Sequence, residues 1–184
     1  MIPLLFVRNE FKLTKQVTPG CEWVARGKGT ASRMWDGLPA LVRGELVYRL
    51  APYEGKPPSW GLPASAELCW VPAMLDEAGK PFCEAFDRMR PMGILADGPH
   101  ELCGPGVEGN NDRLRELTLL RHGQEFVQVG RSFDSIRDYL SEHPIKGIVF
   151  ALPDGRASKI RRTDFGLAWG NVAARAERRM RGRR

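Results

Sequence analysis

The sequence has no long hydrophobic run. Its N-terminal apolar stretch, residues 1–7, has no basic residues before it. It is also far shorter than the ~20 residues that a membrane-spanning helix needs. We therefore expect a soluble protein that is not exported, with a cytoplasmic location and no membrane partner.

Paired metal-binding cysteines are also missing. The four cysteines, at positions 21, 69, 83 and 103, form no C-x-x-C pair, and only three histidines are present. His100-Glu-Leu-Cys103 has no second pair to accompany it, so the sequence does not indicate a zinc site. Dispersed cysteines without an export signal are typical of reduced thiols in a cytosol-like compartment.

Outside its C-terminus the chain has little net charge. The formal net charge is +6, but residues 175–184 hold six arginines and one glutamate, so they carry +5 and the other 174 residues carry +1. We treat residues 171–184 as a basic C-terminal tail, which is expected to contact nucleic acid or another polyanion. A solvated end without a partner is the alternative.

Glycine and proline are abundant, with 20 and 14 copies, which favours many turns and few long helices. One clear helix is predicted from an N-cap at Ser132 to Pro144. A β-hairpin of residues 147–151 and 157–161 follows it. Further strands are expected near residues 4–7, 30–35, 40–42, 45–50, 68–71, 93–96, 116–120 and 126–128. The predicted fold class is α+β, with antiparallel or mixed sheets flanked by helices in a single domain over residues 1–170.

One glycine motif is rejected as a dinucleotide site. Gly104-Pro-Gly-Val-Glu-Gly109 matches G-x-G-x-x-G, but that motif must open a helix inside a βαβ unit. Pro105 lies within the motif and Asn110-Asn-Asp112 follows it. We expect a tight loop here.

Four short segments recur in order along the domain. They are Met34-Trp-Asp-Gly37, His100-Glu-Leu-Cys-Gly-Pro105, Lys146-Gly-Ile-Val-Phe150 and Lys159-Ile-Arg161. Taken alone, Asp36-Gly37 is typical of a hairpin turn, and residues 145–165 are typical of a hairpin with a solvated basic strand. Lys159 and Arg161 lie two residues apart, however, so both side chains point to the same face of a strand. Two cations on one face can bind a polyphosphate.

Together, these segments resemble the ATP-dependent RNA ligases of the covalent nucleotidyltransferase superfamily, and most closely the compact RNA ligases related to vertebrate RNA ligase 1. The resemblance spans residues 19–169. It implies a nucleotidyltransferase fold, ATP and Mg²⁺ or Mn²⁺ as cofactors, and RNA as partner; we expect a monomer. It also implies three steps: a lysine takes AMP from ATP, AMP moves to an RNA 5′-phosphate, and a 3′-hydroxyl displaces AMP to seal the strand.

The resemblance also assigns catalytic roles. Met34 stands at the position of the nucleophilic lysine. Asp36 would orient the nucleophile or a metal-bound water, and it is the candidate metal ligand. Lys159 and Arg161 would stabilise the negative charge that develops on the α-phosphate.

The nucleotide-binding residues follow from the same resemblance. Adenine would lie against Ser32 and Arg33, with an aromatic or apolar side chain that we do not identify covering its face. Glu101 would contact the ribose hydroxyls, and Arg49 the ribose or an RNA phosphate. The remaining nucleotide-binding candidates are Gly37 and Lys146.

Two central positions differ from the family pattern. Met34 replaces the lysine, and a thioether cannot form a phosphoramidate with AMP. Lys146 stands where the family usually has a metal-binding glutamate. We favour an RNA ligase inactivated by a Lys-to-Met change, because Asp36, Glu101 and Lys159 are retained. The alternative is a non-catalytic nucleic-acid-binding pseudo-ligase. A capping-type guanylyltransferase is disfavoured, because no appended nucleic-acid-binding fold is found after residue 170.

Overall fold

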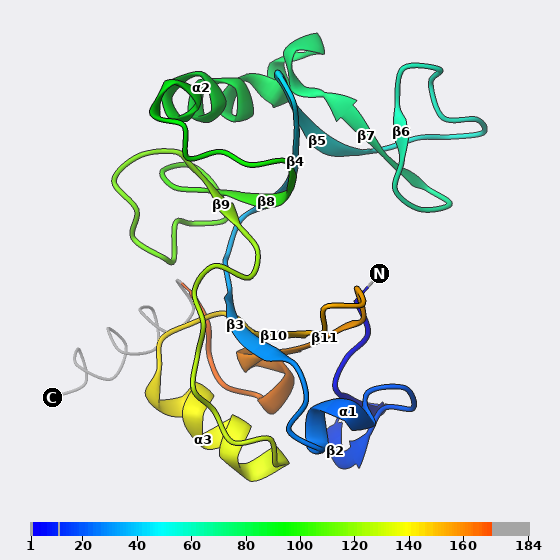
Figure 1. The fold of residues 1–184 in the computed structure, drawn as a ribbon, viewed down its shortest axis with the longest axis vertical. Helices are drawn as coiled ribbons and strands as arrows, with labels where there is room; N and C mark the ends of the chain where they lie inside the picture. The colour runs from blue at the N-terminus through cyan, green and yellow to red at the C-terminus, as the bar shows by residue number, and fades with distance from the viewer. Residues whose placement is uncertain (1, 11, 171–184) are drawn as a thin grey trace, which may run out of the picture. The chain divides into compact units, whose positions relative to one another are not determined.

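The computed structural model describes residues 2–10 and 12–170 (Figure 1). The chain divides into two compact units. The first contains the described residues up to Trp35 and those from Gly123 onward, and the second comprises residues Asp36–His122. The expected domain of residues 1–170 thus contains both units. The basic tail, residues 171–184, lies outside the described residues.

The first unit is organised around a three-stranded antiparallel sheet in the order β11-β10-β3. A separate hairpin is formed by β1 and β2. The elements of this unit are β1 (Phe6–Asn9), β2 (Lys12–Val17), α1 (Glu22–Ala25), β3 (Thr30–Met34), α3 (Phe133–Glu142), β10 (Gly147–Ala151), β11 (Ala157–Arg161) and the 3₁₀ helix η4 (Arg162–Phe165).

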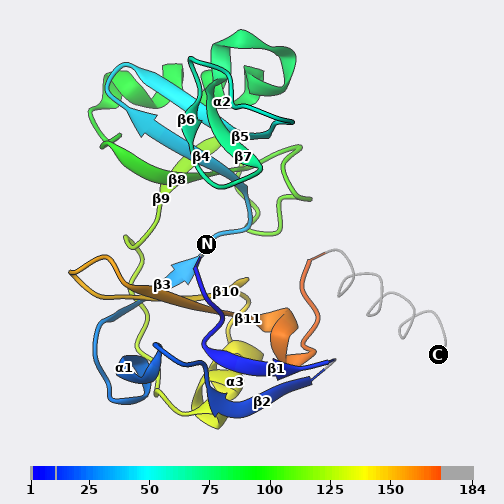
Figure 2. The ribbon, with the colours of Figure 1, turned by 90° about the vertical axis from the view of Figure 1, so that its right-hand side faces the viewer.

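One face of this sheet forms the core of the first unit. Helices α1 and α3 lie on the same side of the sheet (Figures 1 and 2). Ile148, Phe150 and Ile160 on the strands are fully buried together with Ile136 and Leu140 of α3. We call this side the core face. Burying each such side chain stabilises the fold by about 1.5–3 kcal/mol.

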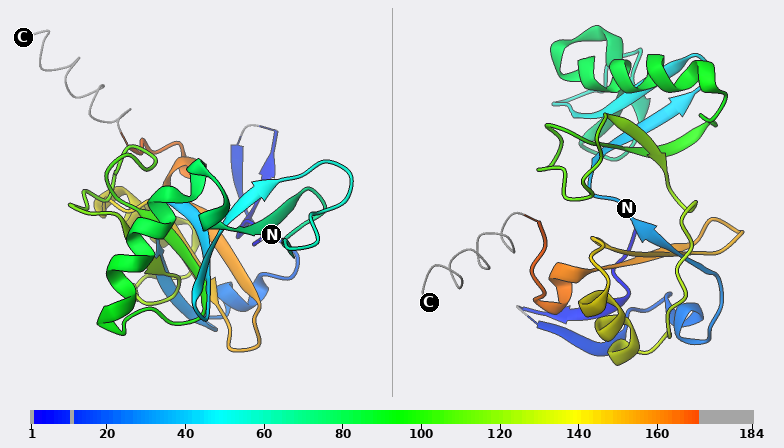
Figure 3. Two further views of the ribbon diagram at one scale, coloured as in Figure 1. Left: turned by 90° about the horizontal axis from the view of Figure 1, so that it is seen from above. Right: turned by 90° about the vertical axis from the view of Figure 1, so that its left-hand side faces the viewer.

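The second unit is a six-stranded antiparallel sheet in the order β6-β7-β5-β4-β8-β9. Helix α2 covers one face through Phe82, Ala85, Phe86 and Met89 (Figure 3). The elements are β4 (Leu38–Arg43), β5 (Leu46–Pro52), β6 (Leu62–Pro63), β7 (Leu68–Pro72), η1 (Ala73–Leu75), η2 (Glu77–Gly79), α2 (Lys80–Met89), η3 (Arg90–Met92), β8 (Gly98–Cys103) and β9 (Thr118–Arg121).

The predicted α+β class with antiparallel sheets is confirmed. The predicted helix is confirmed with its cap: the Ser132 hydroxyl accepts a hydrogen bond from the Ser135 backbone N–H at 3.1 Å, and the helix ends at Glu142. The hairpin of β10 and β11 has the predicted bounds. Gly104–Gly109 is the expected loop, in which the Val107 N–H donates to the Gly104 carbonyl at 3.1 Å.

Other predictions were wrong. No strand covers residues 93–96, where Gly93 instead ends η3 in a left-handed conformation with φ 67°. Asp36-Gly37 is not a hairpin turn, because β3 and β4 belong to different sheets. Neither β2 nor α2 was predicted. Among residues 2–10 and 12–170, no helix has the length and apolar character needed to cross a bilayer.

Candidate functional site

The register of the first sheet brings four predicted site residues onto one face. Directly paired residues of an antiparallel sheet point to the same side. Met34 pairs with Gly147, which pairs with Arg161, and Ser32 pairs with Val149, which pairs with Lys159. We call this side, opposite the core face, the cationic face. The predicted shared face of Lys159 and Arg161 is confirmed.

A fifth side chain joins this face from outside the named strands. Phe126 forms an antiparallel bridge with Ser32, held by hydrogen bonds from Arg33 N to Glu125 O at 2.8 Å and from Val127 N to Ala31 O at 2.9 Å. Phe126 therefore points to the cationic face, and it is 64% exposed. One row across the sheet now reads Phe126, Ser32, Val149, Lys159. Its two ends are three strand spacings apart, about 14 Å.

The side chains along this face differ in exposure and contacts. Ser32 and Met34 are buried, and the Ser32 hydroxyl donates to the Val149 carbonyl at 3.4 Å. Lys159 and Arg161 are half-buried. The backbone of Lys159 is held on its outer edge, because its N–H donates to the Pro3 carbonyl and its carbonyl accepts from the Leu5 N–H.

Arg161 is oriented by a buried carboxylate. Asp164 accepts from the Arg161 backbone N–H at 2.8 Å and from its guanidinium at 3.1 and 3.3 Å. Arg8 of β1 also donates to Asp164, at 2.6 Å. The Asp164 side chain is 1% exposed, and these bonds compensate for its burial. The Arg161 guanidinium is therefore held at the end of β11.

Gly147 lies between Met34 and Arg161 and lacks a side chain. A Cβ atom at this position would lie 2.4 Å from the Ile160 carbonyl oxygen and 3.0 Å from the Arg161 Cα. The close approach of β11 therefore requires glycine. Lys146 directly precedes Gly147 at intermediate exposure, and its carbonyl accepts from the Arg162 N–H at 2.9 Å.

Arg33 does not share the cationic face. It neighbours Ser32 and Met34 on β3, and successive side chains of a strand point to opposite sides. Its guanidinium lies 4.1 Å from the Trp35 ring centroid, and Nη1 is 3.2 Å from Glu125. Arg33 thus stabilises the position of Glu125, the residue next to Phe126.

In the second unit, Asp36 and Gly37 are held by the chain around β8. Asp36 is 6% exposed. Its backbone N–H donates to Asp112 at 2.9 Å, and its carboxylate accepts from the Asn111 amide. A Cβ on Gly37 would lie 2.3 Å from the Leu102 carbonyl oxygen, so only glycine fits there.

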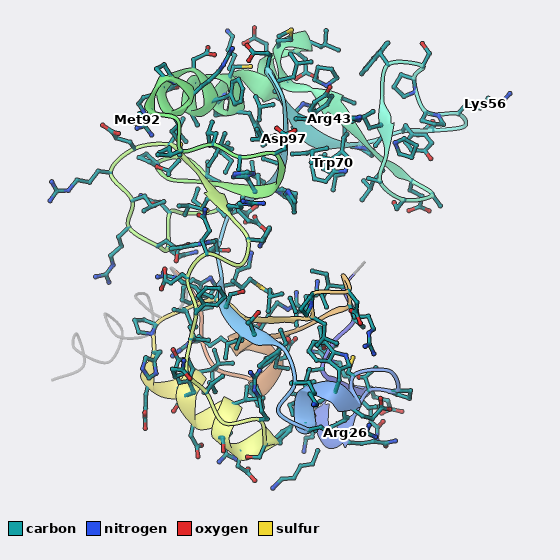
Figure 4. The ribbon with its side chains drawn as sticks, in the orientation of Figure 1. Arg26, Arg43, Lys56, Trp70, Met92 and Asp97 are labelled. Carbon is teal, nitrogen blue, oxygen red and sulfur yellow. The ribbon has the colours of Figure 1, made fainter. Side chains whose placement is uncertain are left out.

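Glu101 has one oxygen with a partner and one without. Its Oε1 lies 3.4 Å from His122 Nε2 of the same unit. Its Oε2 is buried and has no hydrogen-bond partner among the described residues. A buried acceptor without a partner costs free energy, so a ligand hydroxyl at this point would be stabilising. The sheet face that carries Glu101 lies opposite α2 and also carries Trp70 (Figure 4).

Arg49 lies on the other face of that sheet. Ala40 pairs with Arg49, whereas its neighbour Pro39 pairs with Glu101, so the structure does not bring Arg49 and Glu101 together. Arg49 makes a bidentate ion pair with Asp76, with Nε 3.1 Å from Oδ1. The Arg49–Asp76 bond holds the pKa of Asp76 below its usual value. Binding of a phosphate by Arg49 would require this pair to open.

The described residues contain no group of three or more His, Cys, Asp or Glu side chains placed to hold a metal ion. Mg²⁺ bound with a nucleotide commonly uses one or two carboxylates together with the phosphates and water. Asp36 fits that mode of binding, with Asp112 next to it.

Phe126, Asp164 and Asn111 were missed as site residues. Phe126 lies in the predicted segment 126–128, whose edge pairing with β3 no local pattern indicates. The chain matches no protein-family model, and no curated protein is significantly similar to it.

Proposed function

We propose that this chain is a nucleotidyltransferase of the ATP-dependent RNA ligase type whose nucleophile position holds Met34. The supporting observation is the arrangement of the cationic face. An exposed aromatic side chain lies at one end of a sheet row, cations lie at the other, and Met34 is beside them. A nucleotide has the same order of chemistry, with a flat base at one end and phosphates at the other.

Each side chain of this face takes one part of ATP in the proposal. Phe126 covers the adenine ring and so takes the place of the aromatic side chain that the sequence does not identify. Lys159 and Arg161 bind the phosphates, with Asp164 limiting the directions that the Arg161 guanidinium can take. The role of Lys146 in phosphate binding rests on the resemblance alone, because Lys146 directly precedes Gly147 and successive side chains of a strand point to opposite sides.

The resemblance gives roles to two carboxylates, Glu101 and Asp36. Glu101 would contact the ribose hydroxyls, and its buried Oε2, which has no hydrogen-bond partner among the described residues, is the acceptor that such a hydroxyl would meet. Asp36 orients the attacking group or a metal-bound water. Mg²⁺, when bound, would neutralise charge on the phosphates. Arg49 is held in an ion pair with Asp76, which would have to open before Arg49 could bind the ribose or an RNA phosphate.

Nucleotidyl transfer needs an amine at position 34. A neutral amine nitrogen attacks the α-phosphorus; a nitrogen–phosphorus bond forms, the bond to the β-phosphate oxygen breaks, and pyrophosphate leaves. The proton lost by the amine goes to solvent. Nearby cations lower the pKa of such an amine and stabilise the charge that develops in the transition state. Met34 has a similar length but no nitrogen, so the chain as given binds ATP without forming an adenylate.

The experiment is to restore the amine with Met34→Lys and to incubate the protein with Mg²⁺ and ATP labelled at the α-phosphate. The expected result is a covalent label that is acid-labile and that pyrophosphate returns as ATP. With a 5′-phosphate RNA, the variant should pass AMP onward and join the ends. The unchanged chain should take no label.

The pseudo-ligase is the second candidate, favoured by Met34 itself. If Met34→Lys binds ATP and never takes label, the ligase assignment fails and the pseudo-ligase replaces it. If it neither binds ATP nor takes label, both candidates fail.

A further inference from the structure

The loop between β8 and β9, residues 104–117, has an unusual backbone. Three of its residues other than glycine have left-handed conformations, namely Glu108 (φ 44°), Asn110 (φ 49°) and Arg113 (φ 56°). Such conformations cost free energy and persist only where surrounding contacts impose them.

The contacts that impose this shape lie within the loop and in the core beneath it. Val107 is buried against α2 in the core of the second unit. The Asn110 side chain bonds Leu114 twice, donating to its carbonyl at 2.7 Å and accepting from its N–H at 2.9 Å. The loop is therefore fixed on both sides of residues 111 and 112.

These two residues both reach Asp36. The Asp112 carboxylate accepts from the Asp36 backbone N–H at 2.9 Å, and the Asn111 amide donates to the Asp36 carboxylate. The same amide nitrogen also donates to the Glu108 carbonyl at 3.0 Å, which fixes its own direction. Asp36 is thus held at its backbone and its carboxylate by consecutive residues of one loop.

We propose that Asn111 and Asp112 are positioning residues for Asp36 in nucleotidyl transfer, an inference that rests on the proposed function. A neutral amide orients a carboxylate and leaves its negative charge intact, whereas a lysine or arginine would neutralise it. Orientation matters because a displacement of about 1 Å at a reacting centre can cost on the order of 100-fold in rate. The strained loop keeps this orientation before the nucleotide binds.

The test measures single-turnover labelling by α-labelled ATP in the Met34→Lys protein, with and without Asn111→Ala. Three quantities are recorded: the rate constant at saturating ATP, the ATP concentration for half-maximal rate, and the labelled fraction at completion. We expect Asn111→Ala to lower the rate constant by roughly tenfold or more, with the other two quantities unchanged. Asn111→Asp, which removes the donor and adds a like charge, should lower it further. Arg115→Ala, at an exposed position of the same loop, is the matched control and should label at the parent rate.

Each outcome decides the matter. An unchanged rate constant in Asn111→Ala overturns the inference and leaves the proposed function standing. A lower labelled fraction with an unchanged rate constant also overturns it, because this shows a loss of folded protein instead of a misplaced carboxylate. If Met34→Lys itself takes no label, the proposed function fails, and the inference fails with it.

Discussion

Phe126 is a large aromatic side chain left exposed beside Ser32 and in one row with Lys159. Exposed single aromatics are ordinary on protein surfaces, so exposure alone assigns no role. The role proposed for Phe126 is to stack on adenine, and it is supported by the position of the ring, which lies about 14 Å from Lys159 at the opposite end of the same row.

Replacing Phe126 with Ala should weaken ATP binding by about 1–3 kcal/mol, the usual contribution of stacking a base on an aromatic ring. Isothermal titration calorimetry with Mg²⁺–ATP measures this loss. Phe126→Tyr keeps the aromatic surface and should bind as the parent does. Equal affinity in all three proteins would remove Phe126 from the site.

His100 is buried in the second unit, where its Nδ1 donates to the Gly98 carbonyl at 2.9 Å. Burial lowers the pKa of His100 below its ordinary value of 6.5; the hydrogen bond to Gly98 opposes this shift, and the nearby Arg121 and His122 add to it. The unfolded chain therefore binds a proton more readily than the folded chain. Stability from this group is present above pH 6.5 and is lost as the pH falls through the folded-state pKa.

The free energy of unfolding should therefore fall below pH 6.5, by up to about 1.4 kcal/mol per pH unit. Urea unfolding between pH 7.5 and 5.5 measures this slope. His100→Gln should flatten it, whereas His143→Gln, at an exposed position, should leave it unchanged. A slope that is equal in the parent and in His100→Gln would contradict this explanation.

At the scale of elements, the sequence predicted helices and strands correctly where the residues that begin and end an element lie within the segment itself. Helix α3 has its cap and its terminating proline within the segment, and the β10–β11 hairpin has its turn. Helix α2 was not predicted, and Pro81 lies in its first turn. Proline is tolerated in the first helical turn, where backbone N–H groups lack intrahelical partners.

The candidate site was predictable only where side chains alternate on a single strand. Lys159 and Arg161 share a face for that reason. Their alignment with Met34, Ser32 and Phe126 depends on pairing between segments far apart in the chain, which a sequence pattern does not specify. Arg49 and Glu101 were grouped by resemblance, and the sheet register places them on opposite faces.

Gly147 affects both the packing of β10 against β11 and the position of Arg161, with which it pairs. Gly147→Ala would force β11 outward, because its Cβ would meet the Ile160 carbonyl. We expect a loss of about 1–3 kcal/mol in the free energy of unfolding, together with weaker ATP binding, since Arg161 must shift. Thermal unfolding and calorimetry measure the two effects. Ala157→Ser, a small addition at a half-buried position of β11, is the control; an equal loss there would show that β11 tolerates no added atom.

At the scale of the whole molecule, most of the net positive charge lies outside the four motif segments. The tail carries +5 of the net charge of +6, and the motifs end before it. Removing residues 171–184 should weaken RNA binding and reduce its salt dependence by about 0.7 per lost phosphate contact on a single strand. ATP affinity should not change. Titrations of a single-stranded RNA at several salt concentrations measure this, and a salt dependence that truncation leaves intact would exclude a role for the tail.

The central claim is that position 34 faces the bound α-phosphate across the cationic face. The most direct measurement compares three lysine variants with α-labelled ATP: Met34→Lys, Arg33→Lys and Thr30→Lys. Arg33 points to the core side of β3, and Thr30 shares the face of Met34 but lies two rows away. Only Met34→Lys should take label, and peptide mapping should place the AMP at that residue. Labelling of Arg33→Lys or Thr30→Lys to the same extent, or of none of the three, would contradict the claim.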